Sequence, residues 1–165
     1  MWVAMGTMGK MGTMETMEAM MDRLEKGDRL YSQGKYAEAI LAYDEAVRLD
    51  PECARAWNNK AAALAAVGRY AEAIRCSDEA IRLDPHLSWP WNNRGFALRN
   101  LGRVDEALRA YDEALRIDPE GVKVWYNRAA ALEALGRAEE AEAAYARARE
   151  LTLKREATSD SKGQK

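Results

Sequence analysis

Apolar residues recur along most of the chain at steps of three and four positions, the spacing of one face of an α-helix. In one stretch they are Leu108, Tyr111 and Leu115. Each such stretch stops at a glycine, which favours the turn that ends a helix, or before a proline, whose neighbour avoids the helical region. The pattern therefore predicts an all-α chain of short amphipathic helices joined by tight turns.

The residues that stop the helices recur with a period of 34. Glycines, prolines and tryptophans all keep this period, at Gly34, Gly68, Gly102 and Gly136, at Pro51, Pro85 and Pro119, and at Trp57, Trp91 and Trp125. Small residues keep it too, as in the row Gly27, Ala61, Gly95 and Ala129. A larger side chain there would hold two helices apart. Each period is therefore predicted to be one closely packed helix–turn–helix unit.

Together these features resemble the tetratricopeptide repeat (TPR) family. In the second repeat the family signature reads Trp57, Ala61, Leu64, Ala73, Ala80 and Pro85. The sequence departs from it at Ser77, where an aromatic residue is usual, and at Arg23, where the tryptophan should stand. The resemblance implies a right-handed α–α superhelix with a concave groove. Its four repeats would be residues 20–53, 54–87, 88–121 and 122–155.

Both ends of the chain are predicted to be disordered. Residues 1–19 form a low-complexity segment of Met, Gly and Thr, in which a methionine at every third position makes no apolar stripe. Residues 156–165 are too polar to pack. Two further interpretations of the first segment are open. Its soft thioether sulfurs could bind Cu(I), or translation could begin at Met20 or Met21.

The fourth repeat is predicted to end the stack. Glu142 and Arg149 stand where the earlier repeats carry apolar residues that face the next repeat. Burying these charges would cost several kcal/mol unless they were well paired. We therefore expect both side chains to be exposed.

Composition and motifs exclude several functions. The net charge of -2 argues against a nucleic-acid partner, and no apolar run approaches the length of a membrane span. The sequence lacks a phosphate-binding glycine loop and a Ser/His/Asp set; it has one histidine, His86, and two cysteines, Cys53 and Cys76, which we interpret as reduced thiols. We therefore expect a cytoplasmic protein without catalytic residues, metal or cofactor, which acts by binding a protein or peptide.

The resemblance implies that binding occurs in the groove, lined by the first helix of each repeat. Asn59, Asn93 and Asn127 form a row there. Their amides could pair with the backbone of an extended peptide or could serve helix packing. A row of cations could bind ligand or pair with a row of glutamates: Lys26, Lys60, Arg94 and Arg128 with Glu45, Glu79 and Glu113.

The third repeat adds aromatic residues to this face. Trp89 and Phe96 are seven positions apart, on the same side of a helix, and Tyr126 lies close by in register. Aromatic residues flanked by cations and amides are typical of a binding hot spot. Alternatively, Trp89 covers the joint between repeats. The candidate groove residues are Arg55, Asn58, Asn59, Trp89, Asn92, Asn93, Phe96, Lys123, Tyr126 and Asn127.

Chaperone-binding TPR proteins use a carboxylate clamp, and the clamp is incomplete here. Aligned on the first repeat, Leu24 and Asp28 replace its lysine and asparagine, and Trp89 and Asn93 replace its second lysine and its arginine. Only Asn59 fits, and alignment on the second repeat is also incomplete. Binding of chaperone tails is therefore not expected. A rival hypothesis is a structural protein that self-associates through its first repeat, which lacks the tryptophan.

Overall fold

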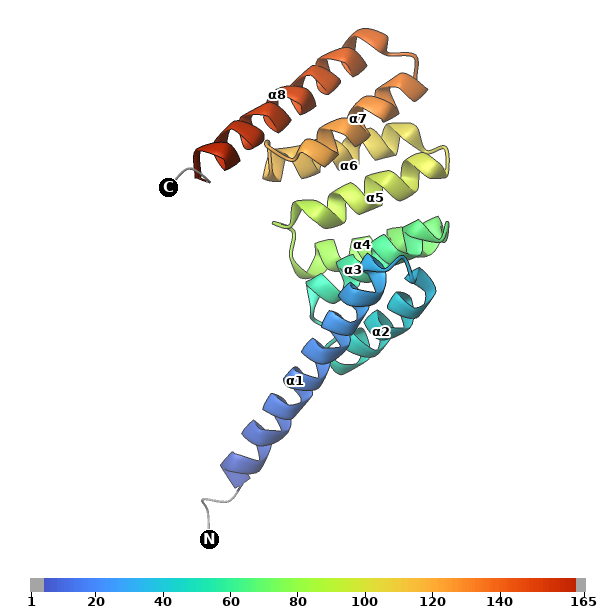
Figure 1. Ribbon diagram of the computed structural model, residues 1–165. Coiled ribbons are helices and arrows are strands. Elements are labelled where there is room, and N and C mark those ends of the chain that lie inside the picture. The colour runs from blue at the N-terminus through green and yellow to red at the C-terminus, as the bar shows by residue number, and fades with distance from the viewer. Residues whose placement is uncertain (1–4, 163–165) are drawn as a thin grey trace. The chain divides into compact units, whose positions relative to one another are not determined.

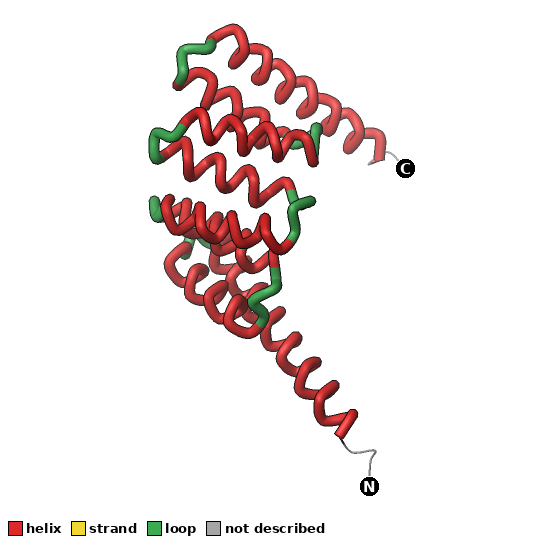
Figure 2. Tube along the Cα trace, turned by 180° about the vertical axis from the view of Figure 1, so that it is seen from behind, coloured by secondary structure: helices red, strands yellow, loops and turns green. Residues whose placement is uncertain are grey.

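The computed structural model describes residues 5–162, with side chains from 14 to 157. The described chain is helical throughout and contains no strand (Figure 1). The helices are α1 (Met5–Ser32), α2 (Tyr36–Leu49), α3 (Ala54–Ala66), α4 (Tyr70–Leu83), α5 (Ser88–Asn100), α6 (Val104–Ile117), α7 (Val122–Ala134) and α8 (Ala138–Lys162). Short loops join them (Figure 2). The predicted all-α class and helix–turn–helix units are confirmed.

The helices form two compact units, which we describe separately. Unit 1 (Met1–Asp84) holds α1 to α4, and unit 2 (Pro85–Lys165) holds α5 to α8. In unit 1, α1 packs on α2, α3 on α4, and α2 on α3; in unit 2, α5, α6, α7 and α8 repeat this order. The first helices of the two repeats also touch in each unit, α1 with α3 and α5 with α7.

The periodic glycines make the turn within each repeat. Gly68 has φ +78°, and Gly34, Gly102 and Gly136 adopt the same left-handed conformation. The Gly68 amide donates to the Ala65 carbonyl at 3.1 Å, and the Arg69 amide reaches back to the Leu64 carbonyl at 2.9 Å. This satisfies carbonyls at the end of α3 that the helix itself leaves free. The turn prediction is confirmed.

Close helix contact in the first and third repeats depends on a glycine beneath a tyrosine. A Cβ atom on Gly95 would lie 2.6 Å from Cε1 of Tyr111, and Gly27 meets Tyr43 in the same way. Both tyrosines are fully buried. The equivalent tyrosine of the fourth repeat, Tyr145, is only half-buried; there the glycine is replaced by alanine. Tyr43 and Tyr111 also lie on helices that a following helix covers, α3 on α2 and α7 on α6, whereas α8 packs only on α7.

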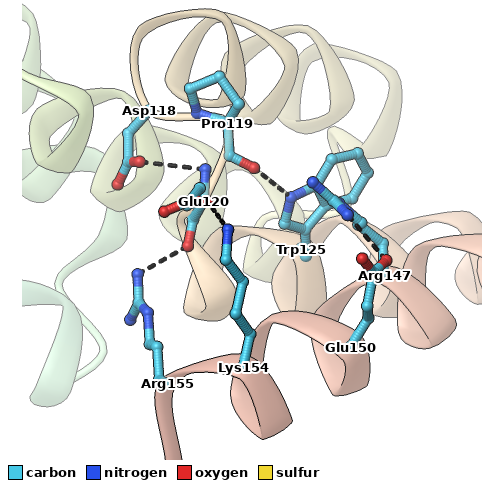
Figure 3. Close-up of polar contacts among 8 residues, drawn as sticks. All are labelled: Asp118, Pro119, Glu120, Trp125, Arg147, Glu150, Lys154 and Arg155. Carbon is cyan, nitrogen blue, oxygen red and sulfur yellow. Dashed lines mark hydrogen bonds and ion pairs between the residues drawn. The ribbon is translucent and has the colours of Figure 1, made fainter. Parts of the chain in front are cut away.

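The proline loops are held by the periodic tryptophans. In the loop between α6 and α7, Nε1 of Trp125 donates to the Pro119 carbonyl at 2.9 Å (Figure 3). Lys154 and Arg155 of α8 bind the side chain and the carbonyl of Glu120, each at 2.8 Å. Trp57 makes the same bond to the Pro51 carbonyl, at 2.9 Å. In contrast, Nε1 of Trp91 is buried and finds no partner among the described residues.

The ends of the chain differ from the prediction. α1 begins at Met5 and α8 continues to Lys162, so most of the two segments expected to be disordered is helical. Methionine, glutamate and lysine favour helix, and extending an existing helix avoids the cost of nucleation. Residues 1–4 and 163–165 lie outside the described part. Glu142 and Arg149 are exposed, as predicted, and pair with each other at 2.6 Å.

Candidate functional site

The predicted groove residues fall into both units. Arg55, Asn58 and Asn59 lie on α3 of unit 1, and the other seven lie on α5 and α7 of unit 2. Each unit therefore presents its own candidate surface, built from the first helices of its two repeats.

In unit 1, these residues surround a carboxylate of the chain itself. Arg55 donates to Oδ2 of Asp28 at 2.6 Å, and Asn59 donates to Oδ1 at 2.8 Å. The hydroxyl of Tyr43, on α2, also donates to Oδ1, at 2.8 Å. Burial and the Asp28 carboxylate together raise the pKa of Tyr43 well above its ordinary value. Asn58 completes the cluster by donating to Oδ1 of Asn59 at 3.0 Å.

In unit 2, the same positions recur two repeats later without the carboxylate. Tyr111, Lys123 and Asn127 correspond to Tyr43, Arg55 and Asn59, but Phe96 stands at the position of Asp28. The Tyr111 hydroxyl is buried and has no hydrogen-bond partner among the described residues. Burial raises the pKa of Tyr111, as it does for Tyr43.

Several of the candidate asparagines donate hydrogen bonds to other residues of the chain. Asn127 donates to Oδ1 of Asn92 at 2.9 Å, which ties α7 to α5. Asn92 is only 1% exposed, so its place among the ligand-binding residues was wrong: the side chain is enclosed between helices. Asn59 likewise donates within the chain, and Asn93 is half-buried. A peptide-binding amide ladder stays a prediction.

The aromatic residues of α5 are accessible. Trp89 is 53% exposed, and Phe96 is half-buried. The Arg99 guanidinium lies 5.6 Å from the centroid of the Phe96 ring, the geometry of a cation–π contact. Lys123 of α7 is exposed. The face of unit 2 thus combines aromatic surface with positive charge.

Tyr126 has a neighbour that the sequence analysis did not identify. Its ring is 6.0 Å from the ring of Tyr145 on α8, and the Tyr145 hydroxyl donates to Glu133 at 2.7 Å. Tyr126 is 40% exposed. It belongs to a pair of tyrosines between α7 and α8, and its role in binding stays a prediction.

The periodic cations form salt bridges, but with other partners than predicted. Lys60 pairs with Asp44 at 2.6 Å, and Arg128 pairs with Asp112 at 2.8 Å. Glu79 and Glu113, the expected partners, instead pair with arginines one helical turn away on their own helices. The neighbouring aspartate row is therefore the one that faces these cations across the helix pair.

The described residues offer little support for other chemistry. They contain no group of three or more His, Cys, Asp or Glu side chains placed to hold a metal ion. Nor does any described helix have the length and apolar character needed to cross a membrane. Cys76 is buried, and burial raises the pKa of its thiol, which disfavours the reactive thiolate. Cu(I) binding by the methionines stays a prediction, since several of them lie where no side chain is described.

Sequence reasoning missed three residues of these surfaces: the acceptor role of Asp28, the cation Arg99 and the buried hydroxyl of Tyr111. A signal for the first was present. The row Asp28, Ala62, Phe96 and Ala130 changes in residue type from repeat to repeat, and only the first repeat has a carboxylate there.

The helix pairs, the glycine turns and the tryptophan-held loops define a repeat protein of the helix–turn–helix class. The chain belongs to the tetratricopeptide repeat family and has its all-α solenoid fold. Models of this family match residues 24–88, 76–109 and 122–154, and a TPR repeat model matches residues 97–136.

Known proteins agree with this assignment. MamA is similar in structure, with a TM-score of 0.73 and 24% identity over 82% of this chain and 80% of MamA. The first TPR domain of human RPAP3 has a TM-score of 0.69 and 26% identity, over 74% of this chain and 96% of that domain. The Hsp70-Hsp90 organizing protein of Triticum aestivum is 50% identical over 38 residues, which are 23% of this chain and 6% of that protein.

Proposed function

We propose that the protein is a non-enzymatic adaptor, and that the α5–α7 face of unit 2 binds an extended peptide or short helix of a protein partner. A role in protein interaction agrees with the family. The RPAP3 domain supports a peptide as the ligand, because it has been solved with the HSP90 peptide SRMEEVD at 26% identity to this chain. We do not extend that ligand to this chain, since its clamp is incomplete.

The observation that carries the proposal is the exposure of Trp89. The fold requires Trp91, its neighbour two positions on, but no sister repeat has an aromatic residue at the position of Trp89. Its exposed half is on the order of 100 Å², and burying that area under a ligand would contribute about 2.5 kcal/mol. Tryptophan is also among the commonest residues of binding hot spots. Phe96 and Arg99 extend the same surface.

Affinity purification of partners with the full chain tests this proposal. Wild type is compared with Trp89→Ala/Phe96→Ala, and Leu153→Ala is the matched control, since Leu153 is also exposed and apolar but lies on α8. We expect the double variant to lose partners that the control retains, with circular dichroism showing equal helix content. Equal recovery by all three proteins would reject the site.

A second candidate is self-association through the first repeat. The observation in its favour is the exposure of Met14, Met17 and Leu41, which are 60%, 62% and 65% exposed on α1 and α2. Arg23 stands where the other repeats have tryptophan. Its guanidinium pairs with Glu45 at 3.0 Å, so an ion pair takes the place of an aromatic contact. Light scattering distinguishes the two candidates: a monomer at every concentration removes self-association and leaves the adaptor proposal intact.

A further inference from the structure

We infer that copies of this protein associate head to tail, with α1 of one copy packed along α8 of another as the first helix of a fifth repeat would pack. The inference rests on the second candidate function, self-association through the first repeat, and names the surface that receives that repeat. It follows from four charged residues, which stand at positions that are apolar in the joints between repeats.

The joints within the two units show what such a contact requires. At each joint the second helix of one repeat lies antiparallel to the first helix of the next, α2 against α3 and α6 against α7. Each of these helices has two buried residues seven positions apart, nearly two helical turns, which form one stripe. The stripes are Ile40 and Val47 with Ala56 and Ala63, and Leu108 and Leu115 with Val124 and Ala131.

An ion pair fixes the register of the antiparallel helices. Lys60 of α3 contacts Asp44 of α2 at 2.6 Å, and the equivalent pair at the second joint lies at 2.8 Å. Val47 comes three positions after Asp44, and Ala56 comes four positions before Lys60. These two stripe residues therefore lie opposite each other, near the loop, and the other two lie opposite each other further from it.

The first helix of the first repeat and the last helix of the fourth carry charges in these stripes. On α1 the stripe consists of Asp22 and Arg29, and on α8 it consists of Glu142 and Arg149. All four side chains are more than half exposed. In the register of the joints, Asp22 of one copy would lie opposite Arg149 of another. Arg29 would lie opposite Glu142, so both contacts join opposite charges.

The pairing offsets the cost of covering these charges. Within one copy Arg149 pairs with Glu142 at 2.6 Å, whereas Asp22 and Arg29 contact neighbours on α1 at 3.8 and 3.9 Å. In the contact each charge would exchange its present neighbour for an opposite charge on the other copy. An unpaired charge is costly to cover, and a paired one is not. The two ends therefore reject an apolar helix and accept one with the complementary order of charge.

Uncovered aromatic surface on α7 and α8 supports the same contact. Tyr145 is half-buried, whereas the equivalent tyrosines on α2 and α6, which a following helix covers, are fully buried. Tyr126 beside it is 40% exposed, and a hollow of about 540 Å³ lies along Tyr145. Met21 of α1 is also exposed, at the position from which Arg55 reaches the preceding first helix. Met21 of another copy would thus reach α7, which carries Tyr126.

The mass of the full chain in solution is the first measurement. Head and tail are different surfaces, so the contact is heterologous and continues into an open chain or closes into a ring. We expect light scattering at rising protein concentration to show an average mass that passes that of a dimer. Salt at about 0.5 M should lower this mass, because it screens ion pairs at the protein surface.

Exchanging the charges at one end gives the sharper test. Asp22→Arg/Arg29→Asp reverses the order of charge on α1, and Glu142→Arg/Arg149→Glu reverses it on α8; neither changes the net charge. Each variant alone opposes like charges and should associate at least tenfold more weakly than wild type, a difference of about 1.4 kcal/mol. An equimolar mixture of the two variants should associate like wild type, because each end then finds its complement on the other variant.

The mixture also shows that both variants are folded, since unfolded copies could not restore the contact. The matched control is Glu113→Arg/Arg116→Glu, which exchanges an exposed ion pair of α6 and should associate as wild type does. A loss as large in this control would show a general effect of surface charge and would overturn the inference.

A further variant tests the register. Ala146 of α8 holds the position of Asp44, and Lys26 of α1 holds the position of Lys60. Ala146→Asp would complete the corresponding ion pair with Lys26 of another copy and should tighten the association about threefold, as expected for an exposed pair. Ala146→Asn supplies the same shape without charge and should not. Equal association of these two variants would overturn the assigned register and the inference with it.

The outcomes separate this inference from the proposed functions. If wild type associates and the exchanged variants do so equally well, or their mixture recovers nothing, the head-to-tail contact is wrong and self-association uses another surface. Monomers in every sample remove the contact and self-association together. The adaptor proposal is unaffected in each case, because it is judged by the partners that Trp89→Ala/Phe96→Ala loses.

Discussion

The first and third repeats share their packing and differ in one side chain above it. Both have a glycine under a buried tyrosine, at Gly27 with Tyr43 and at Gly95 with Tyr111. In the first repeat Asp28 accepts the tyrosine hydroxyl; in the third, Phe96 does not. The comparison teaches that two repeats can share one helix interface, while a single side chain above it decides whether the buried tyrosine hydroxyl has an acceptor within the described chain.

The largest expected effect concerns the feature that both repeats share. Gly95→Val would drive its side chain into the Tyr111 ring, and Gly27→Val would do the same at Tyr43. Overpacking of this kind costs about 3 kcal/mol of unfolding free energy. The control Ala130→Val changes a half-buried helix position and should cost far less. Urea unfolding measures all three. Tolerance of valine at Gly95 alone would show that the third repeat is not packed like the first.

A smaller effect separates the two tyrosines. Tyr43→Phe removes a hydrogen bond to the Asp28 carboxylate and should cost about 1.5 kcal/mol of unfolding free energy. Tyr111→Phe removes a buried hydroxyl that lacks a partner, so stability should stay constant or rise. Thermal unfolding of the two variants gives the difference directly. A loss of similar size in Tyr111→Phe would mean that its hydroxyl has an acceptor in solution.

The dependence of the unfolding free energy on alkaline pH tests the burial of Tyr111. The pKa of Tyr111 is raised in the folded protein, because burial disfavours the charged phenolate. The unfolded chain therefore releases this proton first, near pH 10, and the stabilising contribution, complete below that pH, is lost as pH rises further. Wild type should lose unfolding free energy more steeply above pH 10 than Tyr111→Phe, as measured by urea titration. Parallel curves would place Tyr111 in solvent.

The sequence predicts the repeats well because their turns depend on local residues. Gly68 needs only its own left-handed conformation, and Pro85 acts on its immediate neighbour, so the 34-residue period locates the helices without knowledge of the tertiary structure. The hydrogen-bond partner of an asparagine side chain, in contrast, does not follow from the local sequence. Asn58 and Asn92 hold equivalent positions, yet Asn92 is enclosed and accepts a bond from Asn127, because the acceptor and donor come from neighbouring helices.

The candidate site was predictable only in part for the same reason. The helical angle between Trp89 and Trp91 predicts that they point to different sides, but it leaves open whether Trp89 covers the joint between repeats; the structure leaves it 53% exposed. The pairing of Arg55 with Asp28 joins α3 to α1, and the repeat pattern does not predict it, because the counterparts of Asp28 in the other repeats are not carboxylates. Residues that break a repeat pattern at a constant structural position are therefore the ones to inspect first for function.

The smallest expected effect compares Arg55 with Lys123. Arg55 is more than half exposed, so its bond to Asp28 competes with water, and Arg55→Ala should cost no more than about 1 kcal/mol of unfolding free energy. Lys123 has no acceptor among the described residues, so Lys123→Ala should leave stability unchanged in the same urea measurement. A cost for Lys123→Ala equal to that of Arg55→Ala would show that the chain supplies its own acceptor there. With no such cost, Lys123 contributes nothing to folding, in contrast to Arg55, whose guanidinium reaches Asp28 at 2.6 Å.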